Sequence, residues 1–217
     1  MTDLNAARAN MVASQVRAND VTDPRIQEAM GALPRELFVP RAVRALAYAS
    51  ESVPIGNGRG LMEPRTFAKL AHAARVMQGD VALVVGAGCG YDTAVLAKLA
   101  ETVVAVEEDE DLRREADMVL TRLGIDNAVM VAGLLTEGFS EQAPYDVIFI
   151  DGSVEVVPPA LFVQLRDKGR LAVVEQDGPI GRARIYTRSG TTVSGRTVFD
   201  GAAPGLPGFA RAKEFSF

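Results

Sequence analysis

The feature that most constrains the fold is a strict alternation of apolar runs and helical segments between Val81 and Gln176. The runs VALVV, TVVAVEED, NAVMVAG, YDVIFIDG and GRLAVVEQ each fit a buried strand. Helical patterns stand between them, namely YDTAVLAKLA, DEDLRREADMVLTRLG and PPALFVQLRDKG. Continuously apolar strands are typical of parallel sheets that are buried on both faces. The alternation therefore predicts a parallel α/β sheet covered by helices.

The segments on either side of this alternation differ in character. Three helical pieces are predicted before Ser52 (residues 3–18, TDPRIQEAM and PRELFVPRAVRALAY), and PRTFAKLAHAARVM is predicted as a further helix. After Gly181 the pieces ARIYTRSG, TTVSGRTVF and RAKEFSF read as strands separated by turns. We therefore expect a mainly parallel seven-stranded sheet, with helices on both faces and an antiparallel strand near the C-terminus. The whole chain, 1–217, is predicted as a single domain, with residues 1–64 as a helical N-terminal extension plus a loop.

Composition narrows the classes of function. A net charge of −5 argues against a nucleic-acid partner, because phosphate binding needs a basic face. The single cysteine excludes an internal disulfide and suits a reducing cytoplasm. With only one cysteine and one histidine in the sequence, a zinc site is improbable. The first residues lack the pattern of a signal peptide, and no run of eighteen apolar residues is present, so no membrane partner is expected.

A glycine-rich turn with a following carboxylate is the clearest sign of a ligand site. Gly86, Gly88 and Gly90 lie between a predicted strand and a predicted helix, where the backbone can approach a ligand closely. Glu107 ends the next strand, where a carboxylate can accept the hydroxyl protons of a ribose. Together they predict a site for a nucleoside-containing cofactor. The third glycine comes one position too early for the dinucleotide fingerprint, and this spacing is typical of S-adenosylmethionine methyltransferases.

Longer motifs resemble those of the protein-L-isoaspartate O-methyltransferases. They are MVASQVRANDVTDPRIQEAMGALPRELFVP, LAYASESVPIGNG, VVGAGCGYDTAVLAKLA and APYDVIFIDGSVEVVPPALFVQLRDKGRLAV, in that order. The C-terminal PGLPGFARAKEFSF matches less well. The resemblance implies a Rossmann-like class I methyltransferase fold, S-adenosyl-L-methionine as cofactor and isoaspartyl proteins or peptides as substrate. It implies cofactor contacts at Gly86, Ala87, Gly88, Gly90, Tyr91, Glu107, Gly133 and Leu134.

The sequence departs from this family at the site itself. The family's active-site loop reads Gly-x-Gly-Gln-Thr-Ile-Ser-Gln-Pro, and it falls on Gly56 to Pro64 in SVPIGNGRGLMEPRTFAKL. Arg59 replaces the glutamine, Gly60 the threonine and Met62 the serine, so both hydroxyls are lost. Leu134 also replaces the aspartate that would face the adenine. We expect weak or no transfer to isoaspartyl peptides, with Arg59 able to attract a carboxylate.

The other candidate positions have two readings each. Asp151, at the end of the fourth strand, is either a base or ligand for another acceptor or the cap of the next turn. Met62 is either part of the catalytic loop or an apolar plug beside the cofactor site. The chain as a whole is read as a methyltransferase of this family, as a non-catalytic relative that serves as a binding module, or, as a third alternative, as a nucleotide-dependent oxidoreductase. Its oligomeric state is not determined by the sequence.

Overall fold

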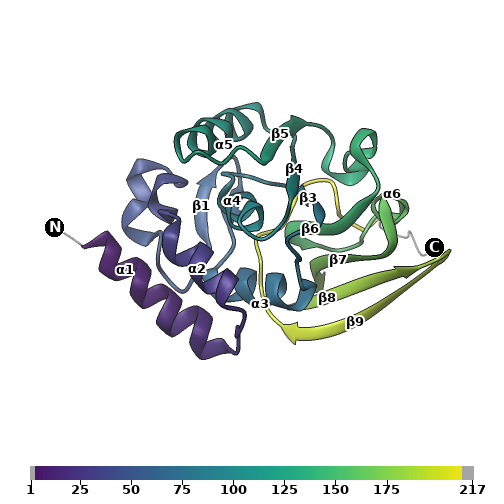
Figure 1. The fold of residues 1–217 in the computed structure, drawn as a ribbon, viewed down its shortest axis with the longest axis horizontal. Coiled ribbons are helices and arrows are strands. Elements are labelled where there is room, and N and C mark those ends of the chain that lie inside the picture. The colour runs from purple at the N-terminus through teal and green to yellow at the C-terminus, as the bar shows by residue number, and fades with distance from the viewer. Residues whose placement is uncertain (1–2, 212–217) are drawn as a thin grey trace, which may run out of the picture.

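A computed structural model describes residues 3–211, and a seven-stranded sheet forms its centre (Figure 1). The strand order is β5-β4-β3-β6-β7-β8-β9. The strands are β3 (Val81–Val85), β4 (Thr102–Glu107), β5 (Ala128–Ala132), β6 (Tyr145–Val154), β7 (Leu165–Asp177), β8 (Ile180–Ser189) and β9 (Thr192–Asp200). Strands β3 to β7 are parallel, β8 runs against β7, and β9 runs against β8. The predicted sheet with one reversed strand near the C-terminus is confirmed.

Side chains of the central strands alternate between two apolar layers. In β3, Ala82 and Val84 join one buried cluster, whereas Leu83 and Val85 join the other. The first layer is covered by α1 (Leu4–Met11), α2 (Pro24–Ala32), α3 (Pro64–Ala74), α4 (Tyr91–Ala97) and α5 (Glu110–Arg122). The second is covered by α6 (Pro159–Val163) and short 3-10 turns. Both faces of the sheet are therefore buried, which explains why its strands are apolar throughout.

The N-terminal helices follow the predicted order, with two refinements. Helix α1 continues through a π-helical turn, Val12–Val16, and a 3-10 turn, Arg17–Asn19. Asp23 caps α2, as expected, by accepting the N–H of Arg25 at 2.9 Å. The predicted third helix is instead two 3-10 pieces, Arg35–Leu37 and Arg41–Leu46, because Pro40 between them lacks the N–H that a continuous helix needs.

One predicted helix is largely wrong. The stretch PPALFVQLRDKG is helical only over α6, and strand β7 already begins at Leu165. Leu165 pairs with Tyr145 of β6, so tertiary pairing overrides the local helical pattern after Val163. The predicted terminal strand RAKEFSF lies almost wholly outside the described residues.

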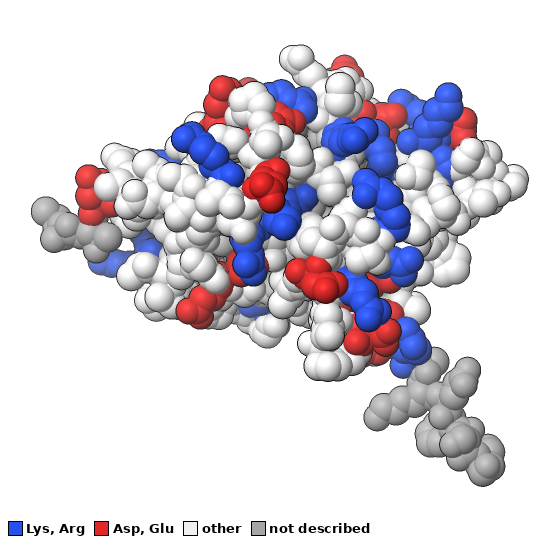
Figure 2. Space-filling model, turned by 90° about the horizontal axis from the view of Figure 1, so that it is seen from below, with Lys and Arg blue, Asp and Glu red and all other residues white. Residues whose placement is uncertain are grey.

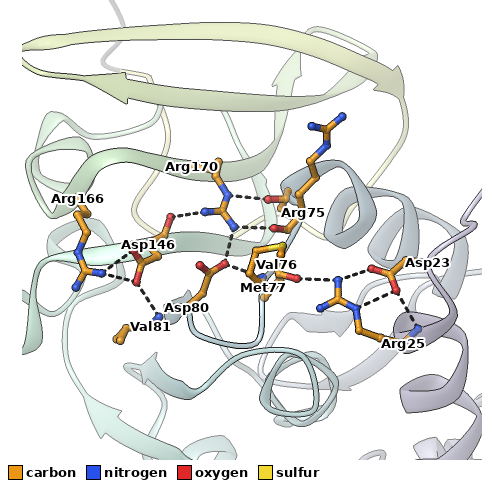
Figure 3. Close-up of polar contacts among 11 residues, drawn as sticks. Asp23, Arg25, Arg75, Val76, Met77, Asp80, Val81, Asp146, Arg166 and Arg170 are labelled. Carbon is orange, nitrogen blue, oxygen red and sulfur yellow. Dashed lines mark hydrogen bonds and ion pairs between the residues drawn. The ribbon is translucent and has the colours of Figure 1, made fainter.

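A polar network ties together the amino-terminal edge of the sheet (Figure 3). The Arg170 guanidinium of β7 donates to the carbonyls of Ala74 and Arg75 at 2.8 and 2.7 Å, and to the Asp80 carboxylate at 2.5 Å. Nearby, Arg166 pairs with Asp146 at 2.8 Å. These contacts join the end of α3 to the starts of β3 and β7, on the edge opposite to the glycine turn. They are structural in character.

Two segments outside the sheet bear on the site. The hairpin of β1 (Val53–Gly56) and β2 (Arg59–Leu61) contains the loop with the three changed family positions. The segment after β9, yellow in Figure 1, runs back from the lower edge of the molecule to the end of β6, where Gly205 bridges Ser153. On the face seen from below, acidic and basic side chains are interspersed (Figure 2). Among the helices of residues 3–211, none is long and apolar enough to span a membrane.

Candidate functional site

The predicted cofactor residues meet at the carboxyl edge of the sheet. Val85 at the end of β3 lies in register with Val106 of β4 and Ile150 of β6, so the turn after β3, Glu107 and Asp151 end at the same edge. Gly86, Gly88 and Gly90 have φ values of 78°, 51° and 84°, a left-handed backbone that favours glycine. The amides of Gly86 and Ala87 donate to the Val106 carbonyl. Every residue of this turn, 86–90, is buried.

Glu107 is wholly buried, and both of its carboxylate oxygens have protein donors. Oε2 accepts the N–H of Gly88 at 2.7 Å, and Oε1 accepts the N–H of Asp109 at 3.1 Å. Oε1 also pairs with the Arg59 guanidinium at 2.8 Å. The carboxylate that the sequence predicts as a ribose ligand thus already has hydrogen-bond donors within the protein.

Arg59 reaches this carboxylate from the β1–β2 hairpin. Its second terminal nitrogen donates to the Gly86 carbonyl at 3.0 Å, and its side chain is only 7 % exposed. At the tip of the hairpin, the Asn57 amide donates to Asp109 at 2.6 Å and so holds the loop against the start of α5. The sequence indicated that Arg59 attracts a carboxylate, and the carboxylate it contacts here is the chain's own Glu107.

The C-terminal segment covers the same turn. Ser153 donates its N–H to the Pro204 carbonyl at 2.7 Å, and the N–H of Leu206 donates back to the Ser153 carbonyl at 2.9 Å. This pairing holds the Leu206 side chain over the turn, where an ideal Cβ on Gly86 would lie 2.9 Å from Leu206 Cδ2. No sequence motif predicted this contact, because the C-terminal segment that contains Leu206 is the part of the chain that resembles the family least.

The other two altered loop positions, Gly60 and Met62, have different surroundings. Gly60 faces Pro204, whose Cγ would lie 2.9 Å from a Cβ at position 60. The Met62 side chain is fully buried in the first apolar layer, and its carbonyl accepts the Arg35 guanidinium at 2.5 Å. Met62 therefore packs as a core residue, and its place beside a cofactor stays a prediction.

Asp151 faces a second buried carboxyl group, Asp92, at the start of α4. Neither oxygen of Asp92 has a hydrogen-bond donor from the rest of residues 3–211. Burial raises the pKa of Asp92 to about 6, and burial together with the Asp92 charge raises the pKa of Asp151 well above its usual range. The pair is therefore able to hold a proton near neutral pH. Within residues 3–211, no three acidic, histidine or cysteine side chains are grouped to hold a metal ion.

The remaining predicted contacts lie at different depths. Tyr91 is fully buried, with the Arg35 guanidinium 4.6 Å from its ring centroid, so it packs in the core. Burial raises the pKa of the Cys89 thiol to about 12, so the thiol stays protonated. Gly133 follows β5, and Leu134 beside it is 58 % exposed at the rim of the site.

The residues predicted to form a nucleoside site therefore lie together, and other side chains of the chain contact them. The glycine turn, Glu107 and Gly133 stand at the edge where open α/β sheets bind ligands. Arg59 forms an ion pair with the Glu107 carboxylate, and Leu206 lies over the glycine turn. Beside them, a cleft of about 410 Å³ is lined by the β1–β2 hairpin and by Ala202, Ala203, Pro204 and Gly205.

Proteins related in sequence match most of the chain. A protein-L-isoaspartate O-methyltransferase of Koribacter versatilis is 36% identical over 185 residues, 85% of this chain and 81% of the relative. One of Methylorubrum extorquens is 36% identical over 198 residues, 91% of this chain and 84% of the relative.

Solved structures share the fold. A protein-L-isoaspartate O-methyltransferase matches with a TM-score of 0.82 at 24% identity, over 93% of this chain and 66% of that one. A second, described as that of a Plasmodium falciparum enzyme of this type in complex with S-adenosyl-L-homocysteine, matches with a TM-score of 0.79 at 19% identity, over 92% of this chain and 97% of that one. The sequence model of one family matches residues 7–195. The chain therefore belongs to the protein-L-isoaspartate(D-aspartate) O-methyltransferase (PCMT) family.

Proposed function

We propose that the protein is an S-adenosylmethionine-dependent carboxyl methyltransferase of the isoaspartate-repair type, acting on isoaspartyl proteins or peptides or on a related carboxylate. The observation that carries the proposal is the convergence of the Gly86–Gly90 turn, Glu107 and the β1–β2 hairpin at one edge of the sheet. The names of the relatives and the S-adenosyl-L-homocysteine in the Plasmodium falciparum complex support the cofactor.

In this proposal the cofactor supplies an activated methyl group. Glu107 would receive the ribose hydroxyls once Arg59 has left it, and the Gly86–Gly90 turn would lie against the methionine end. Gly133 and Leu134 would border the base. These assignments rest on the position of each residue at the carboxyl edge of the sheet.

The acceptor chemistry makes few demands on the protein. The α-carboxyl group of an isoaspartyl residue has a pKa of about 3.5, so it is ionised at pH 7 and needs no general base. The protein's contribution is then to hold that carboxylate in line with the methyl group. The cleft beside Arg59 and Gly60 is open to such a group, although neither Gly60 nor Met62 offers it a hydroxyl.

A second candidate function is that of a non-catalytic relative that keeps the fold as a binding module. The observation in its favour is the occupation of the cofactor frame by Arg59 and Leu206. For either candidate we place the protein in the cytoplasm, since its single cysteine is unpaired and buried.

Two assays in parallel test the proposal. Calorimetric titration of the full chain with S-adenosylhomocysteine and with NAD identifies the cofactor class, and we expect only the first to bind. Methyl transfer to an isoaspartyl peptide, with the normal aspartyl peptide as control and the Koribacter versatilis relative assayed alongside, measures the activity. We expect transfer well below that of the relative. Binding without transfer to any carboxylate would favour the second candidate, and binding of NAD alone would overturn both.

A further inference from the structure

Arg59 and the C-terminal segment fill the site by two independent sets of contacts. Arg59 contributes charge, through its ion pair with Glu107 and its bond to the Gly86 carbonyl. The segment contributes bulk, through Leu206 over the turn. Because the two elements are far apart in the chain, local sequence preference does not bring them together.

Glycines accommodate the C-terminal segment at three places. An ideal Cβ would lie 2.9 Å from Pro204 Cγ at Gly60, 2.9 Å from Leu206 Cδ2 at Gly86 and 2.7 Å from Leu206 Cγ at Gly152. These glycines belong to the hairpin, the cofactor turn and the end of β6. A side chain at any of them would collide with the segment, so the segment fits a groove whose walls are bare backbone.

Polar bonds also fasten the segment in this groove. Ser153 donates through its hydroxyl to the Ala203 carbonyl at 2.9 Å, in addition to its two backbone bonds with Pro204 and Leu206. The Leu206 side chain and the Arg59 guanidinium are the groups nearest to an ideal Cβ at Gly86. The segment is thus held in the groove by hydrogen bonds along one edge and by an apolar side chain that points inward.

We propose that Arg59 and Leu206 are an internal occupant of the nucleoside site, and that the cofactor binds only after both withdraw. This inference rests on the proposed function, because it assumes that a nucleoside cofactor uses the Gly86 turn and Glu107. Arg59 competes with the ribose for Glu107, and Leu206 competes for the space above the turn. The apparent affinity is then the intrinsic affinity multiplied by the fraction of molecules that are open.

The test is titration calorimetry of the full chain with S-adenosylhomocysteine. Arg59→Gln removes the charge and keeps an amide that can still donate to Glu107, and Leu206→Ala removes the bulk without touching the ion pair. We expect each to lower the dissociation constant by about tenfold or more, as for a site whose open form is a minor population. The combined variant should bind more tightly than either.

Matched controls separate competition from general loosening. Arg166→Gln breaks an ion pair at the opposite edge of the sheet, and Leu46→Ala shortens a leucine that is 50 % exposed. Both should bind as the native protein does. If Arg59→Gln fails to fold, Leu206→Ala still decides the question.

The outcomes are distinct. Tight binding by the native protein that Arg59→Gln and Leu206→Ala leave unchanged would overturn the internal occupant and leave the proposed function standing. Weaker binding by Arg59→Gln would make Arg59 a cofactor ligand and also overturn it. Absence of binding in every form would overturn the proposed function, and the competition with it.

Discussion

Arg59 and Glu107 form an ion pair with an N–O distance of 2.8 Å in which the Glu107 side chain is fully buried and that of Arg59 is 7 % exposed. The pair joins the β1–β2 hairpin to the end of β4 across the glycine turn. Removing one partner leaves the other as a buried, uncompensated charge, which is far more costly than losing the attraction itself.

The first prediction concerns this pair. Glu107→Leu and Arg59→Met, made singly, should each lower the free energy of unfolding by about 3–5 kcal/mol, because each leaves one buried charge without its partner. The variant with both substitutions should lose clearly less free energy of unfolding than the sum of the two single losses. Urea unfolding followed by circular dichroism measures all four forms. Simple additivity would show that the two charges are not coupled.

The second prediction concerns the pH dependence of stability. The pKa of Asp92 is raised to about 6 in the folded protein, above its ordinary 3.8. The folded state therefore binds more protons than the unfolded state between these values, and stability falls as the pH rises through them. Asp92→Asn removes this loss, so at pH 8 the variant should be more stable than the native protein by about 1–3 kcal/mol.

The comparison of the two proteins at several pH values measures the whole effect of the Asp92 charge, including its effect on the pKa of Asp151. Asp151, Arg35 and Arg59 act electrostatically in the same buried region, and they are retained in both forms. Below about pH 3 the advantage of the variant should vanish, because Asp92 is then mostly neutral in both states. A constant difference between pH 4 and pH 8 would contradict the assignment.

The third prediction concerns restoration of the loop hydroxyls. Met62→Ser should cost about 2–5 kcal/mol, because Met62 is fully buried in the first apolar layer. Thermal unfolding should then occur at least about 4 °C lower. Gly60→Thr brings a Cβ to within 2.9 Å of Pro204 Cγ, so the C-terminal segment must shift. A double variant that unfolds at the same temperature as the native protein would contradict this expected loss of stability.

The fourth prediction concerns the turn beneath Leu206. Gly86→Ala should destabilise the protein by about 1–3 kcal/mol, since φ is 78° and the new Cβ meets Leu206. In a Leu206→Ala background the same substitution should cost less, because the backbone strain and the contact with the Arg59 guanidinium remain while the contact with Leu206 is gone. Differential scanning calorimetry of the four forms gives both costs. Equal costs in the two backgrounds would exclude the contact.

The single-domain organisation over residues 1–217 stays a prediction. We expect one cooperative transition on heating, because the first apolar layer contains Met11 and Ile26 of the N-terminal helices together with Ala82 and Phe149 of the sheet. Calorimetric and van't Hoff enthalpies that agree would support it. Two separate transitions would divide residues 1–64 from the rest.

The sequence by itself determined the sheet, its mainly parallel direction and the family. Short-range signals suffice for these, because a continuously apolar run such as VALVV indicates a buried strand and glycines such as those of GAGCG indicate a tight turn. The placement of Glu107 at the carboxyl edge follows from the same signals. The extent of α6 could not be predicted from these signals, because Leu165 belongs to β7 through its pairing with Tyr145, which is distant in the sequence.

Only the tertiary structure decided what occupies the site. Arg59 and Glu107 are 48 positions apart, and Leu206 lies still further from Gly86 along the chain. No local pattern links such positions, since an arginine in a glycine-rich loop reads equally well as a group for an outside ligand. Their contact exists because the hairpin and the returning C-terminal segment converge on one edge of the sheet, where burial makes an unpaired charge costly and so selects the partner within reach.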